Sequence, residues 1–274
     1  MNSLIDFINN NQTLKQLSNC LEFGLHTFEN NILLSHFQSF KVDNEVLTNE
    51  HVQKLHQLIT DDMVSKKSSR RDIIEMDNVL SVFCQTAVYI QSETVSKECI
   101  NPCWIARYFD CVKNICDKEL RILWSKLLIQ ELKQPNTIFL RTLDVFHRAD
   151  KFEIEWFYEI TKFVLDKTCI PEFVITGNQF YKFNKFQTLI DAGFINASMG
   201  SIAYPESTTI HLASAEIKID ILNPPLDMNI YTLTDAGMQI FDLNCETTPD
   251  EYMNKLKDVI ETGNRARVEV VKHQ

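Results

Sequence analysis

Apolar side chains recur at three- and four-residue steps through most of the first 150 residues. These steps match the repeat of an α-helix and gather the apolar side chains on one face, which must be buried against another element. Several such stripes in succession predict a helical bundle for this part of the chain. The clearest stripe follows Asp117 and consists of Leu120, Leu123, Trp124, Leu127, Leu128 and Leu132.

Residues that favour helix ends separate the stripes. Thr48 and Asp117 each precede a stripe, where a side-chain oxygen can accept hydrogen bonds from the first backbone N–H groups of a helix. Pro102 suits the first turn of a helix, and the KQPN segment at 133–136 ends the helix before it. The chain has only six glycines among its 274 residues, which argues against a loop-rich all-β fold.

The pattern changes near residue 150, where strand signals join the helical ones. The AEIKIDIL segment alternates, with Ile217, Ile219 and Ile221 on one face and charged residues on the other. This alternation is typical of a half-buried strand. We therefore expect a predominantly helical α+β protein, with a helical domain over 1–150 and an α+β domain over 151–274.

Three further segments of the second domain have recognisable ends. The CIPEFVIT run at 169–176 is rich in strand-forming residues. A helix after it is predicted to close at Gly193, with a strand leaving at Phe194. Thr234 is the predicted cap of another helix, and the tail is predicted as a helix, a turn at Gly263 and a final strand.

The cysteines and histidines do not form a recognisable metal signature. Cys99, Cys103, Cys111 and Cys116 lie close in sequence, but their spacings of four, eight and five residues differ from the close pairs of structural zinc sites. No H-E-x-x-H motif occurs. We expect reduced thiols that are buried as small apolar side chains, and neither a metal nor another cofactor.

The start of the chain, MNSLIDFINNNQTL, has no basic region followed by a long apolar run, so we expect no secretory signal. No apolar stretch reaches the roughly 20 residues that a membrane helix requires. These patterns predict a soluble cytoplasmic protein without a membrane partner.

The middle of the chain resembles an uncharacterised bacterial family that is known only as a domain of unknown function. The likeness covers about residues 70–150 and is weaker beyond them. It implies a helical core followed by a winged-helix-like α+β unit, and relatives near prophage and abortive-infection genes. The matching residues are Trp104, Phe109, Asp117, Glu119, Leu120, Trp124, Lys126, Leu128, Glu131, Pro135, Arg141, Thr142 and Leu143.

Glu131 and Arg141 stand on either side of the break at Pro135, late in one predicted helix and early in the next. A carboxylate and a guanidinium in these places can form a bidentate pair. A catalytic site would need a second acid, a nucleophile or a metal ligand in a known arrangement, and none is recognisable. We predict that the pair is structural and holds the turn.

Two basic segments are candidates for contact with nucleic acid or with a protein partner. One lies between two predicted helices, and the other opens the helix that a winged helix would present to DNA. The net charge of −10 opposes binding to a polyphosphate. The candidate residues are Lys66, Lys67, Arg70, Arg71, Lys182 and Lys185.

A metal-dependent nuclease is a third hypothesis. Glu216 and Lys218 are separated by one residue on a predicted strand, as at the end of a common nuclease arrangement, and Asp191 could supply a metal ligand. The alternation of the strand explains the same residues as a solvated face.

These observations favour a non-enzymatic binding or regulatory protein of bacterial or prophage origin. The resemblance adds an expected role in phage defence. The expected partner is another protein or a second copy of the chain. A winged-helix DNA-binding regulator and the nuclease are the alternatives.

Overall fold

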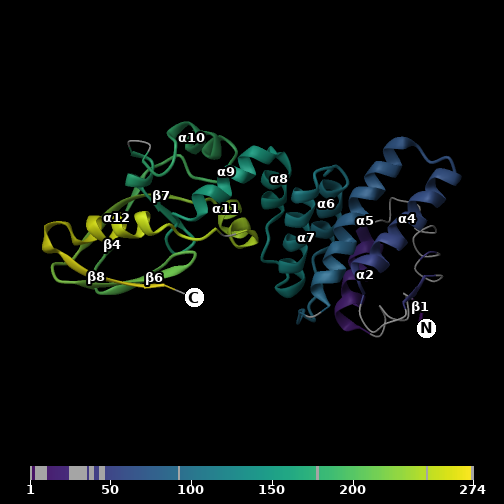
Figure 1. The fold of residues 1–274 in the computed structure, drawn as a ribbon, viewed down its shortest axis with the longest axis horizontal. Coiled ribbons are helices and arrows are strands. Elements are labelled where there is room, and N and C mark those ends of the chain that lie inside the picture. The colour runs from purple at the N-terminus through teal and green to yellow at the C-terminus, as the bar shows by residue number, and fades with distance from the viewer. Residues whose placement is uncertain are drawn as a thin grey trace. The chain divides into compact units, whose positions relative to one another are not determined.

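The computed structural model describes residues 2–3, 11–24, 36, 40–42, 47–91, 93–176, 179–244 and 246–272. The chain divides into two compact units, Met1–Leu143 and Asp144–Gln274 (Figure 1). The described residues form ten α-helices and small antiparallel sheets, so the class is α+β, as predicted.

Within the residues that the structure describes, the first unit is helical apart from one short strand pair. Its central helix is α5, which packs against α2, α4, α6 and α7. The strand pair joins β1 (Asn2–Ser3) to β2 (Lys41–Val42). The helices are α2 (Gln12–Gly24), α4 (Asn49–Ser65), α5 (Arg70–Ile90), α6 (Pro102–Val112) and α7 (Lys118–Lys133), and α8 (Leu140–Arg148) contains the division between the units.

The predicted helix ends are found in the structure. The Thr48 side chain accepts a hydrogen bond from the backbone N–H of His51. The Asp117 carboxylate accepts two, from Glu119 and Leu120. These contacts satisfy N–H groups that a helix leaves unpaired at its start, which explains why α4 and α7 begin where they do.

Helix α5 has the length and hydropathy that a membrane span would need. However, 56% of the 18-residue apolar stretch in α5 is buried inside the protein. That burial is the environment of a core helix, because the apolar side chains already contact other helices.

The second unit contains two three-stranded antiparallel sheets, ordered β3-β7-β4 and β5-β6-β8. Figure 1 shows α12 lying along β8, which it contacts. The helices are α9 (Lys151–Thr161), α10 (Phe183–Asp191), α11 (Asp235–Ile240) and α12 (Asp250–Glu261). The strands are β3 (Cys169–Pro171), β4 (Gly200–Tyr204), β5 (Thr208–His211), β6 (Ala215–Ile221), β7 (Leu226–Thr232) and β8 (Ala266–Lys272).

Strand β6 confirms the predicted alternation. Ile217 and Ile219 are buried, whereas Lys218 and Asp220 are exposed. The strand lies between β5 and β8, so its apolar face contributes to the core of the second unit and its charged face is open.

Two strand predictions were wrong. The CIPEFVIT run forms a strand only as far as Pro171 and continues as a 3-10 helix over Glu172–Val174. After Gly193, which has the expected positive φ of 89°, the chain makes only an isolated bridge at Ile195 before β4 begins.

Candidate interaction site

Helix α10 is held by aromatic contacts on its inner side. Just before it, the Tyr181 hydroxyl donates a hydrogen bond of 2.7 Å to the backbone carbonyl of Trp156 on α9. Phe186 and Leu189 are buried. The centre of the Phe186 ring lies 4.7 Å from the centre of the Tyr231 ring on β7. The helix is therefore fixed between α9 and the β3-β7-β4 sheet.

The outer face of α10 is exposed and carries little net charge. Phe183 at its start has 55% of its surface exposed. One cation and one anion stand among amide and apolar side chains, so the face is close to neutral. The exposed residues are Lys182, Phe183, Asn184, Gln187 and Asp191.

Lys185 does not belong to this outer face. Its ammonium group pairs with Glu159 on α9 and lies 5.1 Å from the centre of the Trp156 ring. Its side chain is only 22% exposed. An ion pair and a cation–π contact hold the Lys185 side chain against α9. Of the two lysines predicted on this helix, only Lys182 is therefore exposed to solvent.

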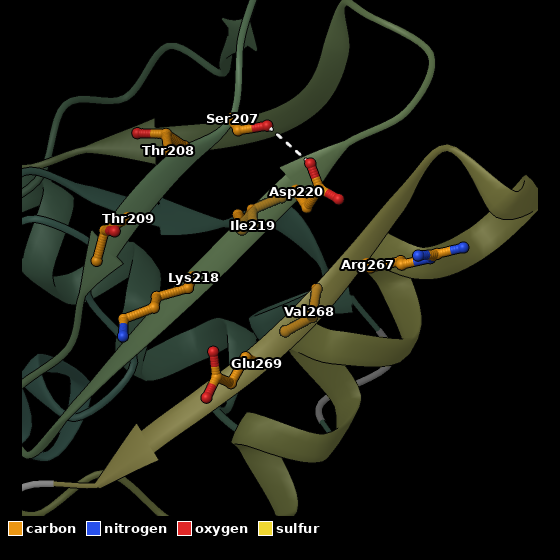
Figure 2. A pocket seen from close by; sticks show the side chains of 9 residues that line it. All are labelled: Ser207, Thr208, Thr209, Lys218, Ile219, Asp220, Arg267, Val268 and Glu269. Carbon is orange, nitrogen blue, oxygen red and sulfur yellow. Dashed lines mark hydrogen bonds between the residues drawn. The ribbon is translucent and has the colours of Figure 1, made fainter.

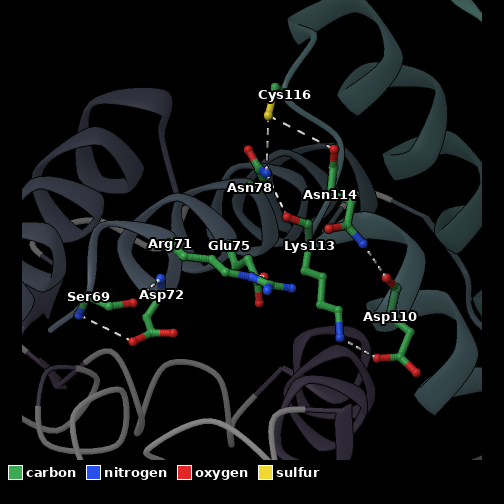
Figure 3. A network of polar contacts seen from close by, with 9 residues as sticks. All are labelled: Ser69, Arg71, Asp72, Glu75, Asn78, Asp110, Lys113, Asn114 and Cys116. Atoms are coloured by element: carbon green, nitrogen blue, oxygen red, sulfur yellow. Dashed lines mark hydrogen bonds and ion pairs between the residues drawn. The ribbon is translucent and has the colours of Figure 1, made fainter.

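The basic segment near residue 66 forms the turn between α4 and α5. Lys66 pairs with Asp62 at 3.0 Å, and Arg71 pairs with Glu75 at 2.6 Å. Figure 3 shows the Arg71 side chain directed toward Glu75, one turn further along α5. Lys67 and Arg70 are exposed. Half of the predicted basic patch is thus neutralised within its own helices.

Glu131 holds the turn at Pro135, but through a different partner from the one predicted. Its two carboxylate oxygens accept hydrogen bonds from the backbone N–H groups of Asn136, at 2.6 Å, and Ile138, at 3.0 Å. Glu131 is fully buried, and this burial raises its pKa. Arg141 is exposed, and the ion pairs seen among the described residues do not join it to Glu131.

A second polar network in the first unit was not predicted. Arg121 on α7 donates to the backbone carbonyl of Ile115, to the Ser81 hydroxyl and to the side-chain oxygens of Asp77 and Asn78. The only sequence signal was an arginine beside an apolar stripe, and its partners on α5 lie about forty residues earlier.

Asn78 completes this network from the core of α5. It is fully buried, and its amide nitrogen donates to the Lys113 carbonyl at 2.7 Å and to the Cys116 sulfur at 3.7 Å. Figure 3 shows Asn78 facing the turn after α6. All of these contacts satisfy groups of the protein itself, so the network is structural.

The residues of the nuclease hypothesis do not come together as a metal site. Lys218 and Asp220 stand on the open face of β6, opposite Glu269 and Arg267 of β8. Figure 2 shows this face, where an open groove of about 420 Å³ runs past them. Glu216 lies instead beside His211. Within the described ranges, no group of three or more His, Cys, Asp or Glu side chains is arranged to hold a metal ion.

The match to known families lies in the middle of the chain. Residues 64–175 match the family described as a protein of unknown function, DUF2806. The resemblance to an uncharacterised family is therefore confirmed. No curated protein and no solved structure matches the chain.

The DUF2806 stretch contains the Arg121 network and the Glu131 turn, whereas α10 lies beyond its end.

The seven described cysteines form no disulfides, but Cys99, Cys103 and Cys116 are exposed. The prediction of uniformly buried thiols was wrong for these three, because they lie at helix ends and in the segments between helices, where no apolar stripe is buried.

Proposed function

We propose that this protein is a non-enzymatic cytoplasmic binding protein whose second unit is a winged-helix-like module that presents α10 to a protein partner. The first unit is proposed to be a helical bundle that acts as a scaffold, and the packing of α5 against four other helices supports this arrangement.

The order of the elements supports a winged-helix-like unit. Helix α9 is followed by β3, a single 3-10 turn, α10, β4 and β7. In the sheet, β7 lies between β3 and β4, as the last strand of a winged helix lies between the other two. The β5–β6 hairpin is inserted between β4 and β7, where the wing of such a module would be enlarged.

The ion pair between Lys185 and Glu159 is the observation that favours a protein partner over DNA. Binding to DNA depends on several cationic side chains that neutralise phosphates. On α10, Lys185 is paired with Glu159, and the remaining cation, Lys182, is offset by Asp191. The exposed Phe183 suits a protein interface, where aromatic side chains often dominate the binding energy.

A DNA-binding regulator is the second candidate, because α10 occupies the place of a recognition helix in the proposed module. The resemblance to relatives near prophage and abortive-infection genes favours a role in phage defence for either candidate.

Affinity capture from a bacterial host, with and without nuclease treatment, tests the proposal. Phe183→Ser should reduce the recovery of the protein partner, and nuclease should leave that recovery unchanged. Leu222→Ser is the control, since Leu222 is similarly exposed in the same unit but directly follows β6, which belongs to the other sheet. Recovery that depends on nucleic acid, or that Phe183→Ser leaves intact, would contradict the proposal.

A further inference from the structure

The helical unit contains a cavity of about 210 Å³ that has no role in the proposed function. It lies among α2, the segment before α6, the first turn of α6 and the end of α7. Its lining is largely apolar, with Cys20, Ile100, Ile105 and Leu132 buried and Pro102 exposed. Polar side chains, among them Gln16, Asn19 and Glu98, complete the lining.

The inner end of the cavity favours uncharged groups. Cys20 is only 5% exposed, and burial, reinforced by the Cys99 thiol and the Glu131 carboxylate, raises the pKa of Cys20 to about 12. The thiol therefore stays protonated at neutral pH and behaves as part of an apolar wall.

The charges around the cavity discriminate between ligands. Glu98 is the one charged residue of the lining, and it is exposed. The buried Glu131 acts on Cys20 from within the unit. No lysine, arginine or histidine contributes to the lining. An anionic ligand would thus meet the Glu98 carboxylate without a cation in the lining to compensate it, whereas a neutral or cationic ligand would not.

The volume limits the size of the ligand. An apolar cavity of about 150 Å³ can hold benzene, and drug-sized ligands occupy sites of about 300 Å³ or more. A cavity of about 210 Å³ falls between these limits and suits one ring or two fused rings.

From these features we infer that the cavity is a binding site for a compact apolar molecule of one or two rings, neutral or positively charged. This inference is independent of the function proposed for α10. The Cys99 thiol, which lines the cavity and is exposed, provides a direct reporter of occupancy.

The test is the rate of alkylation of each exposed thiol by iodoacetamide, measured by peptide mass spectrometry with and without indole. Saturating indole should slow the alkylation of Cys99 several-fold. Cys103 and Cys116 are exposed thiols outside the lining and serve as internal references, so their rates should not change. Equal rates at Cys99 with and without indole would overturn the inference.

The charge of the probe gives a second, separate readout. Tryptamine should protect Cys99 at least as well as indole, and indole-3-acetate should protect it less. Glu98→Gln, a change at an exposed position, should reduce the difference between tryptamine and indole-3-acetate. Equal protection by the two charged probes in the unmodified protein would contradict the assignment of ligand charge.

A filled cavity provides the third readout. Ile105→Phe places a larger side chain in the wall and should abolish the protection by indole while the circular dichroism spectrum stays unchanged. Undiminished protection in this folded variant would show that indole acts elsewhere. If the variant does not fold, the Cys99 rates and the Glu98→Gln comparison still decide the inference.

Discussion

At the scale of single residues, Glu131 shows what a sequence can and cannot indicate. A carboxylate before a helix break suggested a structural role, but its expected partner was a guanidinium. The backbone N–H groups of Asn136 and Ile138 are the donors instead. The conformation of the turn decides which donors reach the carboxylate, and Asn136 adopts a positive φ of 66° there. That choice of backbone conformation is not visible in the pattern of charges.

Removal of the Glu131 carboxylate should destabilise the first unit. Glu131→Ala leaves the backbone N–H groups of Asn136 and Ile138 without their acceptor. The hydrogen bond from Ile138 is buried, and a buried unsatisfied donor costs about 1–3 kcal/mol. Arg141→Ala, at an exposed position, should change the free energy of unfolding by no more than about 0.5 kcal/mol. Urea unfolding of both variants measures the free energy of unfolding, and equal losses in the two variants would support the predicted ion pair between Glu131 and Arg141.

The stability contributed by Glu131 should depend on pH. Because burial raises the pKa of this carboxyl in the folded state, the folded protein binds the proton more tightly than the unfolded chain. The native state is then favoured below the ordinary glutamate pKa and loses this advantage as pH rises through the raised value. The free energy of unfolding of the wild type, relative to that of Glu131→Gln, should therefore be larger at pH 4.5, near the ordinary glutamate pKa, than at pH 7. A reversed trend in urea unfolding would contradict the burial argument.

At the scale of elements, most helices could be predicted because their apolar repeats and caps are local signals. Long-range contacts could not. The partner of Lys185 is Glu159, in another helix, and the pairing of β6 with β8 joins segments separated by α11 and α12. The extents of short strands were predicted least accurately, since β3 ends after three residues although the β-forming residues continue beyond it.

Helix α11 should tolerate no side chain at Gly237. A Cβ there would lie 2.4 Å from the Phe194 carbonyl oxygen, so Gly237→Ala should cost about 1–3 kcal/mol through overpacking. Gly200 has no atom within 4 Å of such a Cβ, which makes Gly200→Ala the matched control. Thermal unfolding compares the two, and a neutral Gly237→Ala would show that α11 packs less closely than described.

Helix α10 should contribute little to DNA binding. We expect fluorescence anisotropy to show weak binding to duplex DNA at physiological salt, with little change in Lys182→Glu. Lys185→Glu should lower the melting temperature instead, because it places a carboxylate beside Glu159 and removes the cation over Trp156. Tight, sequence-selective binding that Lys182→Glu abolishes would favour the DNA-binding regulator.

At the scale of the whole molecule, the α+β class followed from the change of pattern near residue 150. The division of the structure falls at Leu143 and Asp144, inside α8. A continuous helix carries no loop signal, so the sequence offered nothing that would place a boundary within it. The α10 surface is equally hard to foresee, since its near-neutral character depends on where Lys185 turns.

The protein should fold without metal and without disulfides. The seven described cysteines form no disulfides, and both units have extensive apolar cores. A chelator or a reductant should leave the melting temperature unchanged in differential scanning calorimetry. A decrease of many degrees with either reagent would reveal a stabilising metal or disulfide.

The central claim is that α10 faces a protein partner. Its most direct test is photo-crosslinking in host cells with p-benzoylphenylalanine placed at Gln187, an exposed position of α10, and at Glu269, an exposed position of β8 in the same unit. We expect protein adducts at position 187 that resist nuclease, and few adducts at position 269. Nucleic-acid adducts at position 187, or protein adducts at position 269 alone, would contradict the claim.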